Sequence, residues 1–260
     1  MPLRPTQLVD RVADVLEVLA DAGRPVSVTE LATQVGVHKA TASRLLATMA
    51  ARGLVRRESS GYRLGPSLAR LAATAVAELE LVDLARPVLR DLAEQTSEAT
   101  YLSVPHRGAV LYVEQFTPRR AGKVGDWTGR MGPLHCSSSG KVFAAFGAVE
   151  DLGSGLTSPL PVLARRTISD PEDFYRLLPR IRRQGYAVSS DESEDGQTSV
   201  AAPVVTPDGQ VVAALGIGLP TQRCAPGQLA GLGKAAAAAA HALGNRIGPA
   251  HAIVSGSFPD

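Results

Sequence analysis

Short polar and cationic side chains gather on one segment, His38–Leu46, whose sequence is HKATASRLL. Apolar residues recur at helical spacing in and just beyond this segment and define a buried face: Ala42, Leu45, Leu46 and Met49. The hydrogen-bonding and charged residues lie near the N-terminal end of the same helix: His38, Lys39, Thr41, Ser43 and Arg44. Such groups meet base edges and phosphates when a helix end enters the major groove of DNA. The segment therefore predicts the recognition helix of a helix-turn-helix.

The preceding segment, Val26–Val35, predicts the helix that supports it. This segment opens with a capping box, in which Ser27 caps the helix and Glu30 reaches back to the cap amide. Gly36 then suits a tight turn, because glycine adopts a left-handed conformation without a steric penalty. The helix, the turn and the recognition helix follow one another at the spacing of a helix-turn-helix.

A basic hairpin is predicted after the recognition helix, with strands at Leu54–Arg57 and Tyr62–Leu64. It carries Arg56, Arg57 and Arg63, so it resembles the wing that lies on the DNA backbone or in the neighbouring minor groove. A helical bundle with a solvated charged face is the alternative. Charge argues against that alternative, because six lysine and arginine residues stand against one acidic residue between Gly36 and Gly65.

The length of 260 residues favours two domains. We expect a DNA-binding domain at residues 1–65, a linker helix at 66–82, a second domain at 83–248 and a frayed tail at 249–260. The first helix is expected to bury one apolar stripe: Leu8, Val12, Val15, Leu16 and Leu19. In the linker, Leu68, Leu71, Ala75 and Leu79 are expected to form an intersubunit seam.

The second domain alternates helical and strand patterns without a regular βαβ repeat. Helices are predicted at 84–95, 138–146, 171–184 and 226–247, and strands at 99–104, 110–116, 199–206 and 211–219. The Asp208-Gly209 pair favours a hairpin between the last two strands. The fold class is therefore α+β around an antiparallel sheet, and the alanine-rich final helix is expected to pack on that sheet.

Two motifs of the second domain would allow it to be interpreted as an enzyme. Ser138 and Lys141 match the Ser-x-x-Lys of serine acyl-transfer enzymes, but the partner signatures Ser-Asp-Asn and Lys-Thr-Gly are missing from the sequence. His135 and Cys136 place a base beside a thiol, but neighbours on a strand point to opposite faces. We therefore expect no catalytic residues. The acidic run 191–195 is interpreted as a solvated loop, although one of its carboxylates could border a ligand cavity.

Composition excludes several further classes. The two cysteines, Cys136 and Cys224, have no metal-type spacing, so we expect neither a metal, a cofactor nor a disulfide framework. No apolar run reaches the length of a membrane span, and the first ten residues lack the apolar core of a signal peptide. We therefore expect a cytoplasmic protein without a membrane partner.

Ser137, Ser138 and Ser139 stand at the predicted start of a helix, where free amides and the helix dipole favour an anion or a polar acceptor. At least one of them is expected simply to cap the helix. Gly216 and Gly218 leave one face of a strand bare and would make room for a ligand larger than a two-carbon acid. These residues predict a site for an organic acid or carbonyl metabolite, with an aromatic or amide group.

The order of these motifs resembles the isocitrate lyase regulator (IclR) family of bacterial transcription regulators. The resemblance runs from Val12 to Gly244 and includes VTELATQVGVHKATASRLLATMAARGLVRR, YRLG, ARPVLRDLAEQTSEATYLSV, GPLHCSSSGKVFAAF, IRRQGYAVSSDE and SVAAPVVTPDGQVVAALGIGLP. It implies a winged helix-turn-helix followed by a GAF-like effector-binding domain. It also implies a homodimer or homotetramer that binds double-stranded operator DNA.

The same resemblance implies where an effector pocket would form. Its residues would come from the helix start, from the stretch 189–191 and from two strands: Leu134, Ser137, Ser138, Ser139, Ser189, Asp191, Ser199, Gly216 and Gly218. Trp127, the one tryptophan, is expected near the Leu134 loop. We expect a ligand-responsive repressor of a catabolic operon that binds a palindromic operator. A DNA-binding protein without an effector is the alternative, and the size of the second domain argues against it.

Overall fold

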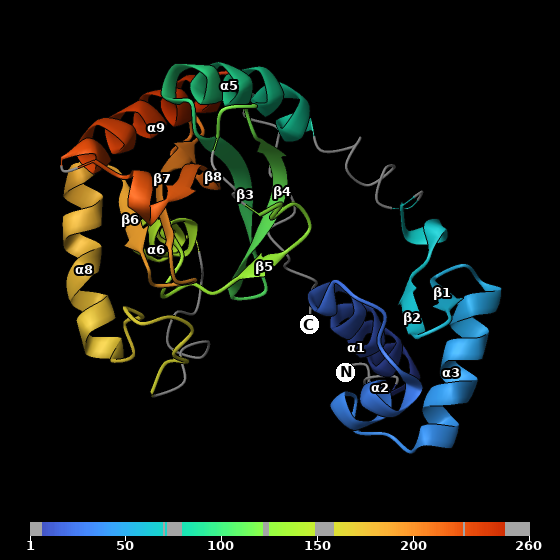
Figure 1. Cartoon of the computed structure of the whole chain (residues 1–260). Helices are drawn as coiled ribbons and strands as arrows, with labels where there is room; N and C mark the ends of the chain where they lie inside the picture. The colour runs from blue at the N-terminus through green and yellow to red at the C-terminus, as the bar shows by residue number, and fades with distance from the viewer. Residues whose placement is uncertain are drawn as a thin grey trace. The chain divides into compact units, whose positions relative to one another are not determined.

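The computed structural model describes residues 7–69, 71, 80–121, 125–148, 159–225 and 227–247. The chain divides into two compact units, and the boundary falls between residues 78 and 79 (Figure 1). Each unit has its own hydrophobic core. The expectation of a two-part chain, with a helical first part and an α+β second part, is therefore correct.

The N-terminal unit is mainly helical. Its elements are α1 (Gln7–Ala22), α2 (Val28–Gln34), α3 (Lys39–Ala51), β1 (Val55–Glu58) and β2 (Gly61–Leu64). Val15, Leu31, Leu46 and Met49 come together in its core, so the inward face predicted for the recognition helix is confirmed. The strands pair antiparallel, with Val55 opposite Leu64. This order of helices followed by a hairpin is a winged helix-turn-helix.

Local geometry explains where these elements begin and turn. The Ser27 hydroxyl accepts a hydrogen bond from the Glu30 amide and caps α2, while the Glu30 carboxylate pairs with Arg24 at 2.6 Å. Gly36 adopts the left-handed conformation, with φ of +69°. Gly61 must be glycine, because a Cβ there would lie 2.4 Å from the Val26 carbonyl oxygen. Val26 and Tyr62 can therefore exchange two backbone hydrogen bonds of 2.9 Å, which fasten the wing to the segment before α2.

The stripe predicted on the first helix is wrong at its N-terminal end. Val15 and Leu19 are buried, whereas the Leu8 side chain is 62% exposed. Leu8 borders an open groove beside Leu45 and Met49 of α3 and does not enter the core. Helical periodicity identifies the side of a helix that is apolar, but not how far along the helix a partner covers it.

The C-terminal unit is built around one sheet. Its elements are α5 (Glu80–Thr96), β3 (Ala99–His106), β4 (Ala109–Phe116), β5 (Met131–Gly132), α6 (Ser138–Phe146), α8 (Pro171–Gln184), β6 (Ala187–Ser190), β7 (Gln197–Val205), β8 (Val211–Pro220), a short 3-10 helix (Thr221–Arg223) and α9 (Gln228–Gly244). The strand order is β5-β4-β3-β8-β7-β6, with every neighbouring pair antiparallel. The fold class predicted for the second domain is therefore correct.

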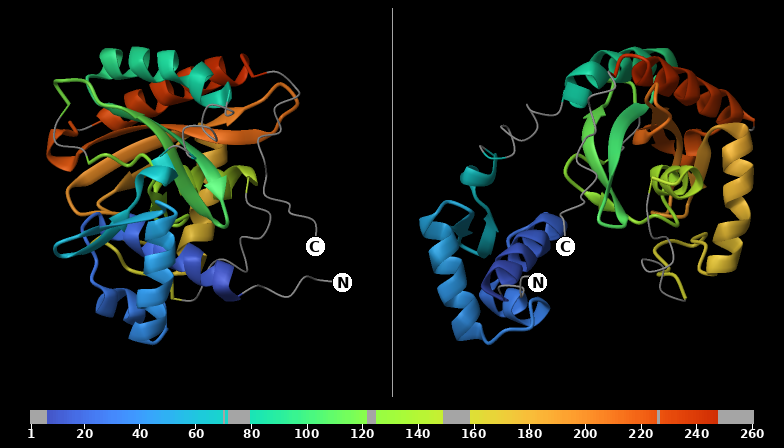
Figure 2. Two further views of the ribbon diagram at one scale, coloured as in Figure 1. Left: turned by 90° about the vertical axis from the view of Figure 1, so that its right-hand side faces the viewer. Right: turned by 180° about the vertical axis from the view of Figure 1, so that it is seen from behind.

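Helices cover both faces of this sheet, as Figure 2 shows. Helices α5 and α9 pack on one face, where Thr100 donates a 2.8 Å hydrogen bond to the Leu89 carbonyl. Helix α6 packs on the other face against β7 and β8, and α8 packs against α6. The face toward α6 carries small residues, Ser199 and Ala201 on β7 and Gly216 on β8. These small residues leave room for a buried helix and for a cavity beside it.

Several predicted boundaries need correction. The β3–β4 turn consists only of Arg107 and Gly108, both at positive φ, so both strands are longer than predicted. Strands β5 and β6 were not predicted, because segments of 2 and 4 residues carry little periodicity. Residues 80–82, assigned to the linker, lie in α5. Most of the linker, including Ala75 and Leu79, and the tail 249–260 lie outside the described residues.

Among the helices that the structure describes, none is long and apolar enough to cross a bilayer.

Candidate functional site

The exposed face of α3 carries the predicted DNA-contacting groups. Lys39, Ser43 and Arg44 are exposed, and Thr41 is half-buried. His38 is the N-cap residue but makes no side-chain cap bond, so its imidazole is not engaged there. Among the described residues, the ion pairs of this unit join Arg24 to Glu30 and Glu58 to two wing arginines. Lys39 and Arg44 therefore keep their charges free of acidic partners within that part of the chain.

The three wing arginines differ in their surroundings. Arg56 and Arg63 lie opposite each other and both pair with Glu58, at 3.1 and 3.3 Å. Arg63 also donates to the Gly23 carbonyl at 3.1 Å, so it fastens the wing to the turn after α1. Arg57 is exposed and faces none of these acids. Of the three, Arg57 is the arginine best placed to meet a phosphate.

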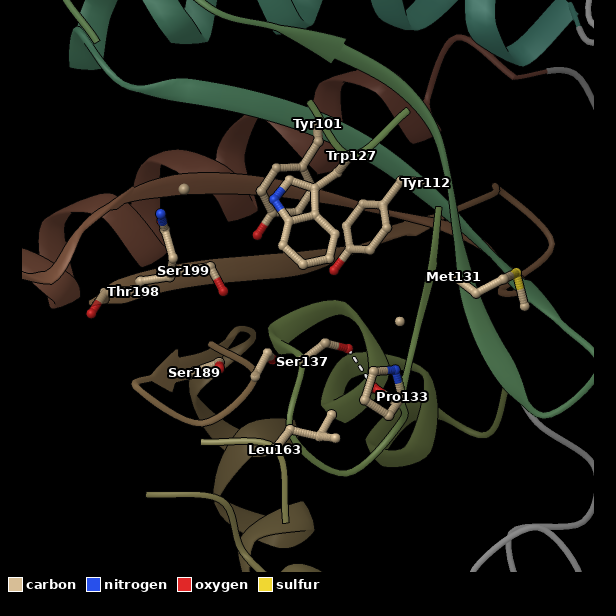
Figure 3. Close-up of a pocket in the computed structure, with 14 residues that line it drawn as sticks. Tyr101, Tyr112, Trp127, Met131, Pro133, Ser137, Leu163, Ser189, Thr198 and Ser199 are labelled. Atoms are coloured by element: carbon tan, nitrogen blue, oxygen red, sulfur yellow. Dashed lines mark hydrogen bonds between the residues drawn. The ribbon is translucent and has the colours of Figure 1, made fainter. Parts of the chain in front are cut away.

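A cavity of about 180 Å³ lies in the C-terminal unit, between the sheet and the start of α6 (Figure 3). Tyr101, Tyr112 and Trp127 form an aromatic wall. The ring centroids of Tyr101 and Tyr112 lie 5.3 Å apart, and those of Tyr112 and Trp127 lie 5.5 Å apart. Hydroxyl and amide groups line a second part, and Met131, Pro133, Leu163 and two glycines complete the lining. The polar residues are Ser137, Ser189, Ser193, Gln197, Thr198 and Ser199. Among the described residues that line it, none has a charged side chain. The cavity therefore suits a ring with polar substituents.

Three hydroxyl groups are linked at the wall of this cavity. The Ser138 hydroxyl lies 3.1 Å from the Tyr101 hydroxyl and 2.9 Å from the Ser199 hydroxyl. Burial raises the pKa of Tyr101, and that of Tyr112 as well. Both phenols therefore stay neutral at physiological pH and can donate a hydrogen bond.

The structure brings together part of the predicted effector set. Ser137, Ser189, Ser199 and Gly218 all line the cavity, and Trp127 joins them. Ser137 is the N-cap of α6 and accepts a 3.0 Å hydrogen bond from the Gly140 amide, so one serine does cap the helix as expected.

Other predicted residues serve elsewhere. Leu134 is core, and Ser138 reaches the cavity only through its hydroxyl partners. Ser139 is fully buried outside the lining, and its hydroxyl has no hydrogen-bond partner among the described residues. Gly216 leaves no room for a ligand, because a Cβ there would lie 2.1 Å from the Tyr101 ring. The Tyr101 ring already occupies the space above Gly216, so this prediction is wrong.

The prediction that Asp191 lines the effector pocket is wrong, and so is the solvated loop predicted around it. The Asp191 side chain is buried and does not line the cavity; it pairs with Arg165 at 2.8 Å and accepts hydrogen bonds from the Gly196 amide and the Thr221 hydroxyl. Glu192 pairs at 2.6 Å with the buried Lys141. These carboxylates hold the loop to the rest of the unit because each has a partner on a distant segment.

The sequence analysis did not predict nine residues of the lining: Tyr101, Tyr112, Met131, Gly132, Pro133, Leu163, Ser193, Gln197 and Thr198. Tyr101 and Tyr112 lie on strands that were predicted, although too short, and strand alternation gives the direction of each side chain relative to its neighbours. Which face borders a cavity depends on the pairing of β3 with β8, and no local signal gives that pairing.

The geometry also argues against the two enzyme readings. The Lys141 ammonium donates to the Val188 carbonyl and the Glu192 carboxylate, while the Ser138 hydroxyl is bonded to the Tyr101 and Ser199 hydroxyls. His135 and Cys136 lie in a turn and not on a strand; His135 bonds to the Pro161 carbonyl. Burial raises the pKa of the Cys136 thiol to about 11, which disfavours a nucleophilic thiolate. Within the described ranges, no cluster of histidine, cysteine and carboxylate side chains could hold a metal ion.

A winged helix-turn-helix joined to an α+β unit with an internal cavity defines the class of DNA-binding transcriptional regulators with an effector domain. Two protein-family models match the chain. The model described as "IclR helix-turn-helix domain" matches residues 8–59, and the model described as "Bacterial transcriptional regulator IclR C-terminal" matches residues 73–245. The chain belongs to the IclR family of bacterial transcriptional regulators. Members of this family are regulators and not enzymes.

Individual relatives cover nearly the whole chain. A glycerol operon regulatory protein of Streptomyces coelicolor is 33% identical over 87% of this chain and 90% of its own length. An IclR regulator of Alicyclobacillus acidocaldarius has a similar crystal structure, with a TM-score of 0.80 and 27% identity over 93% of this chain and 98% of that one. An IclR homologue of Microbacterium hydrocarbonoxydans, solved with 4-hydroxybenzoate, gives a TM-score of 0.74 and 27% identity over 91% and 97%.

Proposed function

We propose that this regulator is a homodimer or homotetramer that binds a palindromic operator through α3 and the wing, and represses a catabolic operon until a small organic acid or carbonyl metabolite fills the cavity. The domains of this proposal are a DNA-binding part at 1–65, a linker from residue 66 to the start of α5 at Glu80, and an effector-binding part from Glu80 to residue 248. The observation that carries it is the neutral, aromatic-walled cavity at the start of α6.

The DNA contacts follow from the free charges of the N-terminal unit. Arg44 and Lys39 stand on the exposed face of α3, where guanidinium and ammonium groups can reach guanine edges or phosphates. Thr41, Ser43 and His38 add hydrogen-bonding groups at the same end of the helix. Arg57 and Arg56 belong to the backbone contacts of the wing, and Arg63 positions the wing through Gly23.

Dimerisation follows from the single recognition helix of each chain. One such helix reads too few base pairs to select a site in a genome, whereas a two-fold dimer reads two half-sites one helical turn apart. A palindromic operator is the consequence of that symmetry.

The size of the cavity limits the effector. A dry cavity of roughly 150 Å³ takes up one benzene molecule, so about 180 Å³ accommodates one ring with a small substituent. Tyr112 and Trp127 offer ring edges and faces to such a ligand. Ser137, the N-cap residue of α6, lines the cavity, so the positive end of the helix dipole beside it favours a carboxylate or carbonyl. The bound 4-hydroxybenzoate of the Microbacterium homologue has this chemistry.

The experiment uses Trp127, the one tryptophan, as an internal reporter of the cavity. The full chain is titrated with benzoate and 4-hydroxybenzoate by calorimetry and by tryptophan fluorescence. We expect saturable binding with a change in emission, and loss of at least tenfold in affinity for Gly218→Leu and Ser137→Ala.

Ser139→Ala is the matched control, because Ser139 is on the same helix but does not line the cavity. Its affinity should equal that of the wild type. Equal affinity for Gly218→Leu and the wild type would place the ligand elsewhere and contradict the proposal.

A further inference from the structure

Tyr101 and Gly216 form a cross-strand pair that shapes the cavity. They lie directly opposite each other where β3 pairs with β8. A Cβ built on Gly216 would lie 2.1 and 2.5 Å from two ring carbons of Tyr101 and 2.8 Å from its hydroxyl oxygen, so the ring rests on the bare backbone of β8. Tyr101 is only 5% exposed, yet it lines the cavity. The tyrosine therefore fills volume that would otherwise belong to the ligand.

The hydroxyl of the same side chain is held in place. It lies 3.1 Å from the Ser138 hydroxyl, which in turn lies 2.9 Å from the Ser199 hydroxyl. Three hydroxyls joined in this way have more protons and lone pairs than their mutual bonds use. The cluster can therefore both donate to and accept from a polar group in the cavity. Figure 3 shows the Tyr101 and Tyr112 hydroxyls on the side of their rings that faces Ser137 and Ser199.

We propose that Tyr101 determines the specificity of the effector cavity: its ring, seated over Gly216, limits the ligand to a single ring, and its hydroxyl, with Ser138 and Ser199, selects a polar substituent. This inference rests on the proposed function and names the residue that sets ligand size and polarity. A tyrosine over a strand glycine also stabilises a sheet by packing. Packing alone would change stability in all variants without changing the preference between ligands.

Two variants separate the roles of ring and hydroxyl. The full chain is titrated with 4-hydroxybenzoate, benzoate and 2-naphthoate. The wild type should bind 4-hydroxybenzoate with an affinity at least tenfold higher than its affinity for 2-naphthoate. Tyr101→Phe keeps the ring, so it should still reject 2-naphthoate but lose about threefold to tenfold in affinity for 4-hydroxybenzoate relative to benzoate. Tyr101→Leu should accept 2-naphthoate at least tenfold more tightly than the wild type. Ser139→Ala is the control and should keep the wild-type preferences.

A ligand-free measurement tests the pairing by itself. Gly216→Ala should lower the melting temperature strongly in the wild type, because the new methyl group meets the Tyr101 ring. The same substitution should cost much less in Tyr101→Leu, whose side chain can yield. Equal losses in both backgrounds would overturn the pairing.

The outcomes for the two proposals are distinct. Binding of no probe to the wild type overturns the proposed aromatic effector and the ligand selectivity assigned to Tyr101. Wild-type binding with unchanged preferences in Tyr101→Leu and Tyr101→Phe overturns the role of Tyr101 alone.

Discussion

Two arginines of the N-terminal unit, Arg44 on α3 and Arg57 on the wing, should differ in what they contribute to DNA binding. Arg44→Ala should weaken binding to the specific site by about 1 to 3 kcal/mol if the guanidinium meets a base edge. Arg57→Ala should weaken specific and random duplexes alike and reduce the salt dependence by about one unit of slope. Gel-shift titrations on both duplexes measure this. An equal loss on both duplexes for Arg44→Ala would remove its base-reading role.

Asp191 gives a residue-scale prediction on stability and pH. Its hydrogen bond with Arg165 lowers its pKa from 3.8, and the Gly196 amide and Thr221 hydroxyl lower it further against the cost of burial. A lowered folded-state pKa means that this stabilisation is complete above pH 3.8 and is lost as the pH falls through the folded-state value. Asp191→Asn should therefore lower the unfolding free energy by about 1 to 3 kcal/mol at pH 7.

Urea denaturation at pH 7 and at pH 3 measures the difference. The gap between wild type and Asp191→Asn should narrow in acid. Asp195→Asn serves as the control, because Asp195 is exposed and its ion pair with Arg165 is long, at 3.7 Å. The amide oxygen of asparagine can still accept the hydrogen bond from the Arg165 backbone amide. A gap that is constant with pH would show that the Asp191 charge does not stabilise the fold.

The residue types predicted the chemistry of the candidate sites better than they predicted where each side chain lies in the fold. Ser137 caps α6 as expected and the cations of α3 are exposed, because capping and helical periodicity are local effects, whereas Ser138 and Ser139 do not line the cavity. Gly216 and Asp191 were misplaced for a different reason. Their roles depend on partners distant in sequence, Tyr101 on β3 and Arg165 before α8, which the sequence around each residue does not reveal.

At the scale of elements, the predicted linker helix carries a prediction on assembly. Leu71 is 47% exposed on the single chain, so its apolar side chain is available to a second copy of the chain. Leu71→Glu and Leu79→Glu should weaken dimerisation and, with it, operator affinity, because a charge would enter an apolar seam. Sedimentation velocity measures the dimer, and an intact dimer in both variants would place the seam elsewhere.

Long, strongly patterned elements were predicted well. Of the short strands only β1 and β2 were predicted, because the glycine-containing loop between them indicates a hairpin. Helices α6 and α8 begin and end where the sequence indicated, since each has a cap residue, Ser137 or Asp170, and a glycine at its end. Strand β6 escaped prediction because its 4 residues alternate too briefly, and β5 because it has only 2. These two strands lie at opposite edges of the sheet, and their surroundings define much of the cavity.

At the scale of the whole molecule, the proposed function requires that occupancy of the cavity changes DNA affinity. A ligand can shift that affinity only if it binds the DNA-competent state and the other state unequally. For a repressor of a catabolic operon, the effector should weaken operator binding.

The fold and the family could be predicted from the sequence because their motifs run along most of the chain. The effector could be predicted only as a chemical class, because its lining comes from separate segments that folding brings together.

The most direct test is a fluorescence anisotropy titration of the full-length protein against a palindromic duplex that the protein itself selects from a random pool. The titration is made with and without saturating 4-hydroxybenzoate, with saturation verified by Trp127 emission. We predict a rise of about 5-fold to 150-fold in the apparent Kd for DNA with the ligand, and no change for Gly218→Leu. An identical Kd in both conditions, with the cavity of the wild type filled, would contradict the account.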